Sequence, residues 1–269
     1  MRRAVAPAAG SRIDDVTRPR SRLQPILMGP PLAEFRRRAV GRTIRTVGRV
    51  GKRVVLGLDS AEQIVLEPRM TGLVLLADPP NASHLRLVFQ LSGGSASQLL
   101  FWDQRGLGVV RLVTPEQFAA FYGPERLGPD ALEIPLESLR GRLGRSRRPI
   151  KVALMDQGML VGVGNLYASE ILHRAHVHPA CPCQRLRPAQ WRRIHTELRQ
   201  VLEEAIIHEG STLSDGTYRV QREGRYQACH RVYQRAGQTC VQCGRGQIVR
   251  IVQAQRSTFF CPKCQKNRD

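Results

Sequence analysis

A chain of 269 residues, 42% of them hydrophobic, is long enough for one large domain or two moderate ones and has a globular rather than a disordered composition. Its 42 lysines and arginines outnumber 22 acidic residues, and the resulting formal charge of +20 points to a polyanion, above all nucleic acid, as partner. No apolar run reaches the roughly 18 residues of a membrane span, and the first residues lack the apolar core of a secretory signal. We therefore expect a cytoplasmic protein with no membrane partner, and its seven cysteines, which do not pair off into a disulfide framework, fit a reducing compartment.

The first part of the chain, from about Thr43 to Val113, has a short β-like pattern. Its four clearest runs of apolar and β-branched residues lie at 53–58, 63–66, 85–91 and 98–102. Glycine, asparagine and proline separate these runs at intervals of about ten residues, which predicts a β-sandwich or a barrel.

The period changes to a helical one after Val113. Thr114 is followed by Pro115 and, three residues after Thr114, by Gln117, which together predict a capping box at a helix start, and Gly123 closes the segment. Helices are predicted from there to about Gly210. The longest runs from Pro188 to His208 and carries one apolar stripe.

A glycine-rich junction opens another helix. Gly162 and Gly164 permit a tight backbone approach, and Asn165 is expected to cap the first turn of the helix that follows. Free amides at a helix N-terminus bind phosphate, so this junction is a candidate DNA contact. Taken alone, this pattern would favour an ordinary capped helix, and only its neighbours in the chain favour a DNA contact.

Four cysteines near the C-terminus form two C-x2-C pairs, Cys240 with Cys243 and Cys261 with Cys264, separated by 17 residues. That spacing supplies four thiolates to one tetrahedral ion, and the absence of acidic or histidine ligands favours a closed structural site holding one Zn²⁺. The alternative is four reduced or disulfide-bonded thiols. Cys181 and Cys183 would make a second soft site only if other ligands converged on them, and Cys229 is expected to be an ordinary thiol.

The residues between the two pairs predict a hairpin. Residues 247–253 alternate apolar and polar, 254–256 break the pattern, and 257–260 run back into Cys261. We expect Arg256 at the tip of this hairpin, where its planar charged fork would suit phosphate or a base edge.

Four local patterns, in this order along the chain, resemble those of one family. Residues 69–72 (Arg-Met-Thr-Gly) are similar to a Met-Ser-Gly turn, and 103–108 to an Asp-Pro-Arg-Arg-Phe-Gly loop. Residues 154–170 are similar to a helix-two-turn-helix core, and 254–261 to a zinc-finger loop. The family is that of the bacterial formamidopyrimidine-DNA glycosylase and endonuclease VIII base-excision enzymes. The resemblance is legible from about Gly41 to the C-terminus.

This resemblance implies an α+β multidomain fold. It implies an N-terminal β-sandwich over 1–120 with its first helix truncated, a helix-two-turn-helix DNA-binding domain over 121–232, and a four-cysteine zinc hairpin over 233–269. Double-stranded DNA with a damaged base would lie in the cleft between the halves, bound by a monomer, with the base flipped out of the stack.

The resemblance also implies roles for individual residues. Met70, Arg105 and Leu107 match the residues that fill the gap left in the duplex, and Met and Leu suit apolar wedges while Arg can hydrogen-bond the orphaned base. Leu107 stands where the family usually has Phe, so stacking should be weaker.

Four further positions match catalytic or DNA-binding residues of the family. Lys52 matches the lysine of β-elimination, Arg256 the arginine linked to δ-elimination, Lys151 a phosphate-binding lysine, and Asn165 lies at the DNA-binding helix start. Without the resemblance, Lys52 and Lys151 would be read as solvated charges.

The beginning of the chain departs from the family. Family members open Met-Pro-Glu-Leu-Pro-Glu, with the proline amine as nucleophile, and residues 1 to about 30 give no match to that opening. Either the start codon lies elsewhere, which retention of Lys52 and Arg256 favours, or the chain is a shortened paralogue that binds damaged DNA without cutting it. Gln104 and Gly106, which replace the usual Pro and Arg, favour the second.

Three functions remain to be weighed. The leading one is a zinc-containing DNA glycosylase with abasic-site lyase activity on oxidised purines, with oxidised pyrimidines as the alternative substrates. The second is a catalytically silent module that recognises damaged DNA. A ribosomal or RNA-binding zinc-ribbon protein would explain charge and cysteines, but not Met70, Arg105 and Asn165 together. The loop from about Ser214 to Arg231, expected to cover the flipped base, has a flexible pattern and does not identify the lesion.

Overall fold

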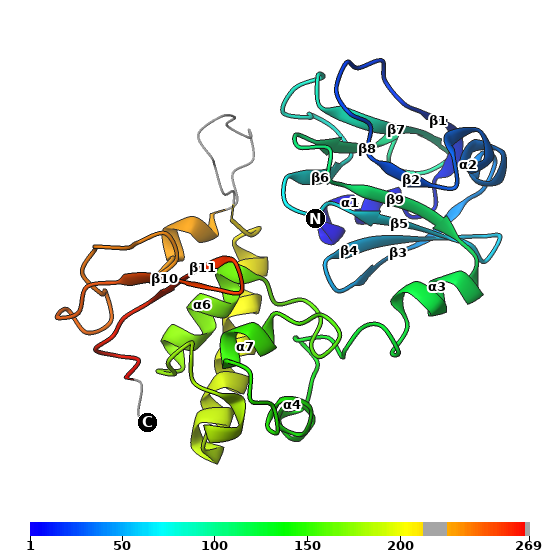
Figure 1. Cartoon of the computed structure of the whole chain (residues 1–269). Helices are drawn as coiled ribbons and strands as arrows, with labels where there is room; N and C mark the ends of the chain where they lie inside the picture. The colour runs from blue at the N-terminus through cyan, green and yellow to red at the C-terminus, as the bar shows by residue number, and fades with distance from the viewer. Residues whose placement is uncertain (212–224, 267–269) are drawn as a thin grey trace. The chain divides into compact units, whose positions relative to one another are not determined.

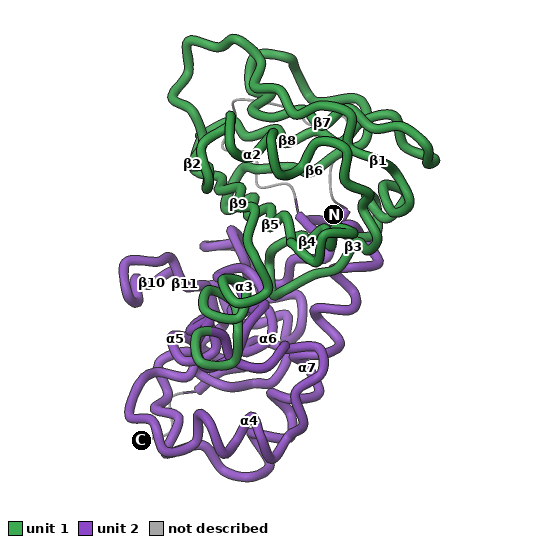
Figure 2. Tube along the Cα trace, turned by 90° about the vertical axis from the view of Figure 1, so that its right-hand side faces the viewer, with its two compact units in different colours: residues 1–126 green, residues 127–269 purple. Residues whose placement is uncertain are grey.

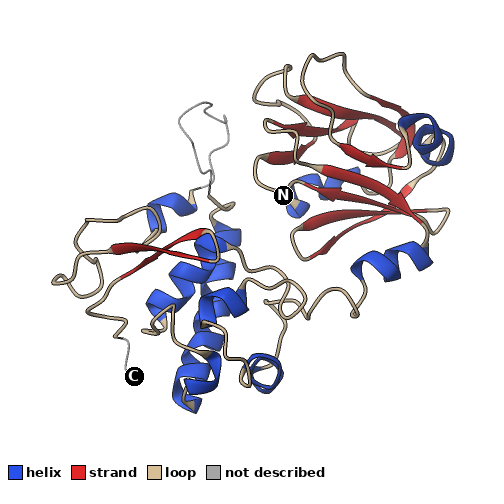
Figure 3. Ribbon diagram, in the orientation of Figure 1, coloured by secondary structure: helices blue, strands red, loops and turns tan. Residues whose placement is uncertain are grey.

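We describe a computed structural model of the chain, which covers residues 1–211 and 225–266 (Figure 1). The chain divides into two compact units, residues 1–126 and 127–269 (Figure 2). Strands dominate the first unit, and helices with one two-stranded hairpin make up the second (Figure 3). Within the described residues, no helix combines the length and the apolar character that crossing a membrane requires.

The first unit is a sandwich of two sheets. A four-stranded sheet has the order β1-β7-β8-β6, and a five-stranded sheet has the order β2-β9-β5-β4-β3, in which β2 and β9 run parallel and every other pair is antiparallel. The strand bounds are β1 (Arg12–Thr17), β2 (Leu27–Gly29), β3 (Ile44–Val50), β4 (Arg53–Leu58), β5 (Gln63–Glu67), β6 (Gly72–Leu75), β7 (Leu85–Ser92), β8 (Gln98–Asp103) and β9 (Val109–Val113).

The core of the sandwich explains why these segments become strands. β5 and β8 are buried along nearly their whole length, so their continuous apolar runs fit strands covered on both faces. The four predicted runs are confirmed as β4, β5, β7 and β8. The remaining strands are short or interrupted by charges, as in the Asp14-Asp15 pair of β1, and their apolar pattern alone is too weak to predict them.

Short helices flank the sheets of this unit: α1 (Arg2–Val5), the 3₁₀ turn η1 (Ala6–Ala8), α2 (Leu32–Ala39) and α3 (Pro115–Tyr122). The predicted capping box of α3 is confirmed, because Thr114 Oγ1 accepts from the Gln117 amide and the Gln117 side chain accepts from the Thr114 amide. Phe35 of α2 packs edge-on against Phe89 of β7 at a ring-centroid distance of 6.1 Å.

The second unit is built on helices: α4 (Leu136–Leu143), α5 (Ile150–Leu154), α6 (Asn165–Arg174) and α7 (Pro188–Ile207), with 3₁₀ turns η2 (Cys183–Arg185) and η3 (Tyr226–Cys229). The predicted stripe of α7 is confirmed except at its last member, Ile206, which is 39% exposed. The stripe buries Trp191, Ile194, Leu198, Val201, Leu202 and Ala205 in the core of this unit.

The C-terminal hairpin consists of β10 (Val249–Gln253) and β11 (Arg256–Phe260). Ala254 and Gln255 form its two-residue turn and both have a positive φ, 45° and 60°, as a tight hairpin turn requires. Arg256 therefore pairs with Gln253 as the first residue of β11. Our expectation that Arg256 itself occupies the tip was one residue off, because the turn uses only two residues.

Candidate nucleic-acid interface and zinc centre

The four knuckle cysteines converge on one point. Their Sγ atoms all lie within 4.8 Å of one another, and Cys240–Cys264 and Cys243–Cys261 are each 3.8 Å apart. Four sulfurs at about 2.3 Å from a tetrahedral ion would be about 3.8 Å from each other. The thiolate set therefore fits one Zn²⁺, as the spacing predicted.

The backbone around the sulfurs is shaped for this site. Amides of Arg245 and Gly246 point to the Cys243 sulfur and lower its pKa to about 6, which favours the thiolate that binds metal. A Cβ on Gly246 would lie 2.6 Å from the Cys261 sulfur, so only glycine allows the knuckle to close here. Cys240 and Cys261 are buried, as expected for a structural site.

A buried lysine ties the second unit's helices to the zinc hairpin. Lys151 of α5 is 0% exposed, and its Nζ donates to Asn165 Oδ1 at 2.6 Å, to Thr258 Oγ1 at 2.7 Å and to the Ser257 carbonyl at 3.2 Å. Burial, and then the charge of Arg256, lower the pKa of Lys151 to about 8. The reading of Lys151 as an exposed solvated charge is therefore wrong.

Asn165 does not cap α6 as expected. The N-cap is Gly164, and Asn165 is the first residue of the helix. Its side chain accepts from Lys151 and donates from Nδ2 to the Ser257 carbonyl at 3.0 Å. Asn165 thus joins the N-terminus of α6 to the strand that begins with Arg256, whose side chain is exposed.

In the first unit, two adjacent loops present Met70, Arg105 and Leu107. Met70 and Leu107 are 73% and 46% exposed. Arg105 Nη1 lies 3.5 Å from Met70 Sδ, so two of the three residues predicted to act together are in contact.

Asp103 organises these two loops. Its Oδ1 accepts from Thr71 Oγ1 at 2.6 Å and from the Arg105 amide at 3.3 Å, and its Oδ2 accepts from the Gly108 amide at 2.7 Å. Gly106 has a φ of 66°, the left-handed region that favours glycine, so it can close the loop where the family has an arginine.

Arg86 is a residue that sequence reasoning missed. It is 4% exposed and donates to the carbonyls of Asp103 at 2.6 Å, Gln104 at 3.1 Å and Gln24 at 3.1 Å. The sequence did offer a signal, because Arg86 is a charged residue within the mostly apolar run of β7. An arginine buried at such a position must donate to several acceptors. Arg86 therefore holds the loop that presents Arg105 and Leu107.

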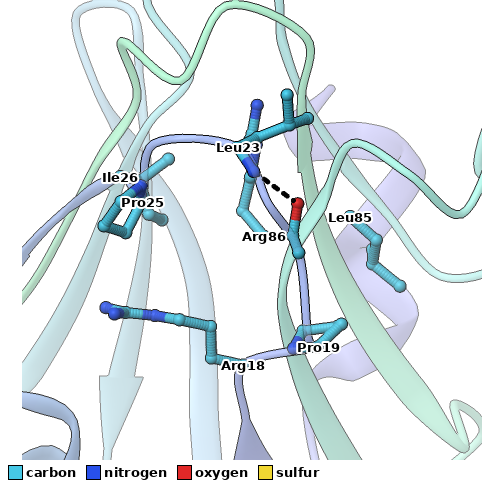
Figure 4. Close-up of a pocket in the computed structure, with 8 residues that line it drawn as sticks. Arg18, Pro19, Leu23, Pro25, Ile26, Leu85 and Arg86 are labelled. Atoms are coloured by element: carbon cyan, nitrogen blue, oxygen red, sulfur yellow. Dashed lines mark hydrogen bonds between the residues drawn. The ribbon is translucent and has the colours of Figure 1, made fainter.

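A surface pocket lies beside Arg86 (Figure 4). Its volume is about 180 Å³, and it is lined by Arg18, Pro19, Ser21, Leu23, Pro25, Ile26, Leu85 and Arg86. That volume is smaller than the roughly 300 Å³ at which small-molecule sites begin. The guanidinium of Arg86 is already used by three carbonyls, so we assign no ligand to this pocket.

Lys52 lies in the turn that joins β3 to β4, and its side chain is exposed. The strand after this turn is anchored by Glu67, which is 5% exposed and pairs with Arg53 at 3.0 Å. Arg111 and the Tyr122 hydroxyl also contact the Glu67 carboxylate, the hydroxyl at 2.9 Å. This network holds the end of the sheet from which Lys52 projects.

The other cysteines do not make a metal site of comparable quality. Among the described residues, Cys181 and Cys183 belong to no group of three or more potential ligands, and burial raises the pKa of Cys183 to about 11. Cys229 lies near Glu204 and His208. Arg174 Nη1 is 2.9 Å from the Glu204 carboxylate and Arg231 Nη1 is 3.7 Å away, and their charges oppose a cation there.

The zinc hairpin, the helical unit and the β-sandwich together define a zinc-finger DNA-binding protein of the helix-two-turn-helix type. Family models for the formamidopyrimidine-DNA glycosylase N-terminal domain, the formamidopyrimidine-DNA glycosylase H2TH domain, and the zinc finger found in FPG and IleRS match residues 1–110, 127–217 and 237–267.

Individual relatives agree with these matches. The formamidopyrimidine-DNA glycosylase of Chloroflexus aurantiacus is 38% identical over 244 residues, covering 90% of this chain and 86% of the relative. That of Solibacter usitatus is 36% identical over 264 residues, covering 98% and 96%. A solved complex between the Lactococcus lactis Fpg and DNA containing an abasic site superposes with a TM-score of 0.85 at 25% identity, covering 99% of this chain and 97% of that one.

The chain belongs to the formamidopyrimidine-DNA glycosylase family. The expectation that the likeness begins only near Gly41 was wrong, since the N-terminal family model matches from residue 1. The earlier segment is hard to recognise because few of its residues reach the core: Ile13 and Val16 of β1, and Phe35 and Ala39 of α2, are buried between charged neighbours. Most of the loop predicted to cover the base, residues 214–224, lies outside the described residues.

Proposed function

We propose that this protein is a DNA glycosylase with abasic-site lyase activity that flips and excises oxidised purines in base-excision repair. The observation that carries the proposal is the junction of Lys151, Asn165 and Ser257, which fastens the exposed Arg256 of the zinc hairpin beside the N-terminus of α6. Membership of the family supplies the chemistry, and this junction supplies a place where DNA phosphate would be held.

The phosphate would be bound by two kinds of donor. Arg256 offers a charged planar fork, and the first turn of α6 offers backbone amides at the positive end of its dipole. The Nζ of Lys151 is already shared among three acceptors, so we propose that it contributes charge and holds the Ser257 carbonyl in place.

The gap left by the flipped base would be filled by the exposed group in the first unit. Met70 and Leu107 are apolar wedges, and Arg105 would donate to the base that has lost its partner. The exposure of both apolar side chains, 73% for Met70 and 46% for Leu107, supports this role because it leaves them available to enter the duplex.

The later steps would open the sugar and break the strand. In the family's scheme an amine attacks the sugar carbon and forms an iminium as the base leaves, and loss of a neighbouring proton then eliminates the phosphate. We propose Lys52 for the first elimination and Arg256 for the second.

Zinc takes no part in these steps. Four cysteine ligands leave no open coordination position, so the ion would serve only to hold the hairpin that carries Arg256.

A catalytically silent binder of damaged DNA is the less favoured alternative. This alternative is supported by Gln104 and Gly106, which replace the usual Pro and Arg in the Arg105 loop. Against it stand relatives at 36% to 38% identity that carry the glycosylase name. Cytoplasmic location, a monomeric state and oxidised purines as the preferred lesion stay predictions.

The experiment uses a duplex with one oxidised guanine and measures base release, strand cleavage and borohydride-trapped adduct. The 269-residue chain is tested beside a form that carries any upstream residues encoded by its gene. We expect little adduct from the first form and, if the upstream residues include the Pro-Glu-Leu-Pro-Glu segment, both adduct and cleavage from the second. Lys52→Ala should then slow elimination more than lesion binding.

Two results would change the proposal. Lesion-selective binding by both forms without base release would establish the silent binder. Robust adduct from the 269-residue chain would mean that another amine, such as Lys52 or the terminal amine, acts as the nucleophile, and peptide mapping of the adduct would identify it.

A further inference from the structure

His173 is buried beside the zinc centre although it is not one of the ligands. It lies in the last turn of α6, is 0% exposed, and its Nε2 is 3.4 Å from the Sγ of Cys240. Cys240 is itself 0% exposed, so water does not compete at either atom. When Cys240 binds zinc its sulfur is a thiolate without a proton, so a hydrogen bond here requires the nitrogen to carry the proton and the sulfur to accept it.

The surroundings of the imidazole indicate which nitrogen is protonated. Within residues 1–211 and 225–266, the buried Nδ1 of His173 makes no hydrogen bond. Placing the single proton of a neutral ring on Nδ1 would orphan a buried N–H and turn the Nε2 lone pair toward a sulfur that is also rich in electrons. The arrangement without these two costs is Nε2–H donating to the thiolate.

We propose that His173 is a positioning residue of the zinc centre, whose Nε2–H donates to the Cys240 thiolate and fastens the first knuckle to α6. Backbone amides also reach the knuckle sulfurs, but among the side chains of the described residues His173 is the one donor other than a cysteine that does so. Donors of this kind around a metal typically change its affinity 10- to 100-fold.

The position of His173 on α6 extends the proposal to the whole hairpin. Asn165 and His173 are eight residues apart, so they lie on the same face of the helix about 12 Å from each other. Asn165 holds the Ser257 carbonyl, and His173 holds Cys240. Between them, Glu170 accepts from the amides of Val232 and Tyr233 at 3.0 and 2.8 Å, in the segment that leads into the first knuckle.

α6 therefore contacts the zinc-binding segment through three of its residues, Asn165, Glu170 and His173. Figure 1 shows this helix alongside β11. The same helix begins at the proposed phosphate site. The placement of Arg256 would therefore depend also on the contact between His173 and Cys240 at the other end of α6. The proposal rests on the zinc centre alone and can fail while the glycosylase proposal stands.

The first test measures zinc release from the full zinc-loaded protein into excess chelator, with a zinc-sensitive dye as readout. His173→Phe, which keeps a ring but has no N–H, should release zinc about 10-fold faster. His173→Gln places an amide N–H near the position of Nε2 and should stay within about 3-fold of the wild type. His195→Phe is the matched control, because His195 bonds the Ile134 carbonyl in the same unit, away from the cysteines.

Release from His173→Phe at the wild-type rate would overturn the proposal. Equal acceleration in His173→Phe and His173→Gln would also overturn it, because side-chain shape and not the donor would then matter.

A second measurement uses the unmutated protein and decides the matter if His173→Phe does not fold. With ¹¹³Cd in place of zinc, the Nε2 proton of His173 should show scalar coupling to the metal through the sulfur, and the ring should be the Nε2–H tautomer. An Nδ1–H tautomer without that coupling would refute the hydrogen bond.

Discussion

Thr71 donates a hydrogen bond of 2.6 Å from Oγ1 to Oδ1 of Asp103, and so joins the turn that presents Met70 to the loop that presents Arg105. Thr71 Oγ1 also accepts from the Arg105 amide at 3.1 Å. One hydroxyl therefore sets the spacing of two residues proposed to enter the same gap in DNA. The usual serine of this turn carries the same hydroxyl, which explains why threonine can replace it.

Replacement of Thr71 by valine should impair lesion processing more than DNA binding. The substitution removes the hydroxyl, keeps the shape, and leaves Asp103 without a hydrogen bond worth about 1.5–3 kcal/mol. We expect single-turnover excision of an oxidised purine to slow about 10-fold, with intact-duplex affinity changed less than about 2-fold. Thr17→Val, the same change at an exposed position of β1, is the control. Equal excision rates in both variants would contradict the role of Thr71.

Arg86→Met should destabilise the first unit and loosen the Arg105 loop. It leaves the carbonyls of Asp103, Gln104 and Gln24 without their donor, at a cost on the order of 2–4 kcal/mol in the free energy of unfolding. Chemical denaturation measures this, with Arg12→Met as the control that removes an exposed guanidinium. A loss below about 1 kcal/mol would show that water replaces Arg86 at the carbonyls.

Cys261→Ser should abolish stoichiometric zinc and weaken DNA binding while the β-sandwich stays folded. The metal ties the base of the hairpin, so its loss frees Arg256, whereas the sandwich has its own core. Elemental analysis and DNA titration measure the two effects. Unchanged metal content would show that these four cysteines are not the ligand set.

Arg256→Ala should weaken binding to damaged and intact duplex alike if the side chain contacts phosphate only. Loss of one phosphate contact lowers the slope of log affinity against log salt by about one. Arg250→Ala in β10 of the same hairpin tests whether any exposed arginine there has this effect. Wild-type affinity that stays flat from low to physiological salt would contradict a binding surface based on charge.

Lys151 should make stability depend on pH in the alkaline range. Its pKa is lowered to about 8 in the folded protein, from 10.5, so the unfolded chain binds more protons between these values. The free energy of unfolding then rises with pH across that window, and this contribution is lost as pH falls through about 8. Relative to Lys151→Met, the wild type should gain on the order of 2 kcal/mol between pH 7.5 and 10, measured by denaturation. A constant difference would mean that Lys151 titrates normally.

Much of the fold was predictable because its signals are local. The capping box at Thr114, the stripe of α7 and the runs of β4, β5, β7 and β8 each depend on residues a few positions apart. β1 and β2 were not predictable, because their apolar patterns are weak and their pairing partners, β7 for β1 and β9 for β2, lie far along the chain.

The sequence by itself determined the zinc ligands and the family. The cysteine spacing and the four motifs each lie within short segments, and they can be recognised without knowing what those segments contact in the fold. Only the tertiary structure decided that Lys151 is buried, that Asn165 bridges instead of capping, and that Arg86 and His173 support the proposed site. The bond from Lys151 to the Ser257 carbonyl joins residues 106 positions apart, and that from His173 to Cys240 spans 67. The protonation and contacts of such side chains follow from the partners that folding brings to them, and no local pattern specifies those partners.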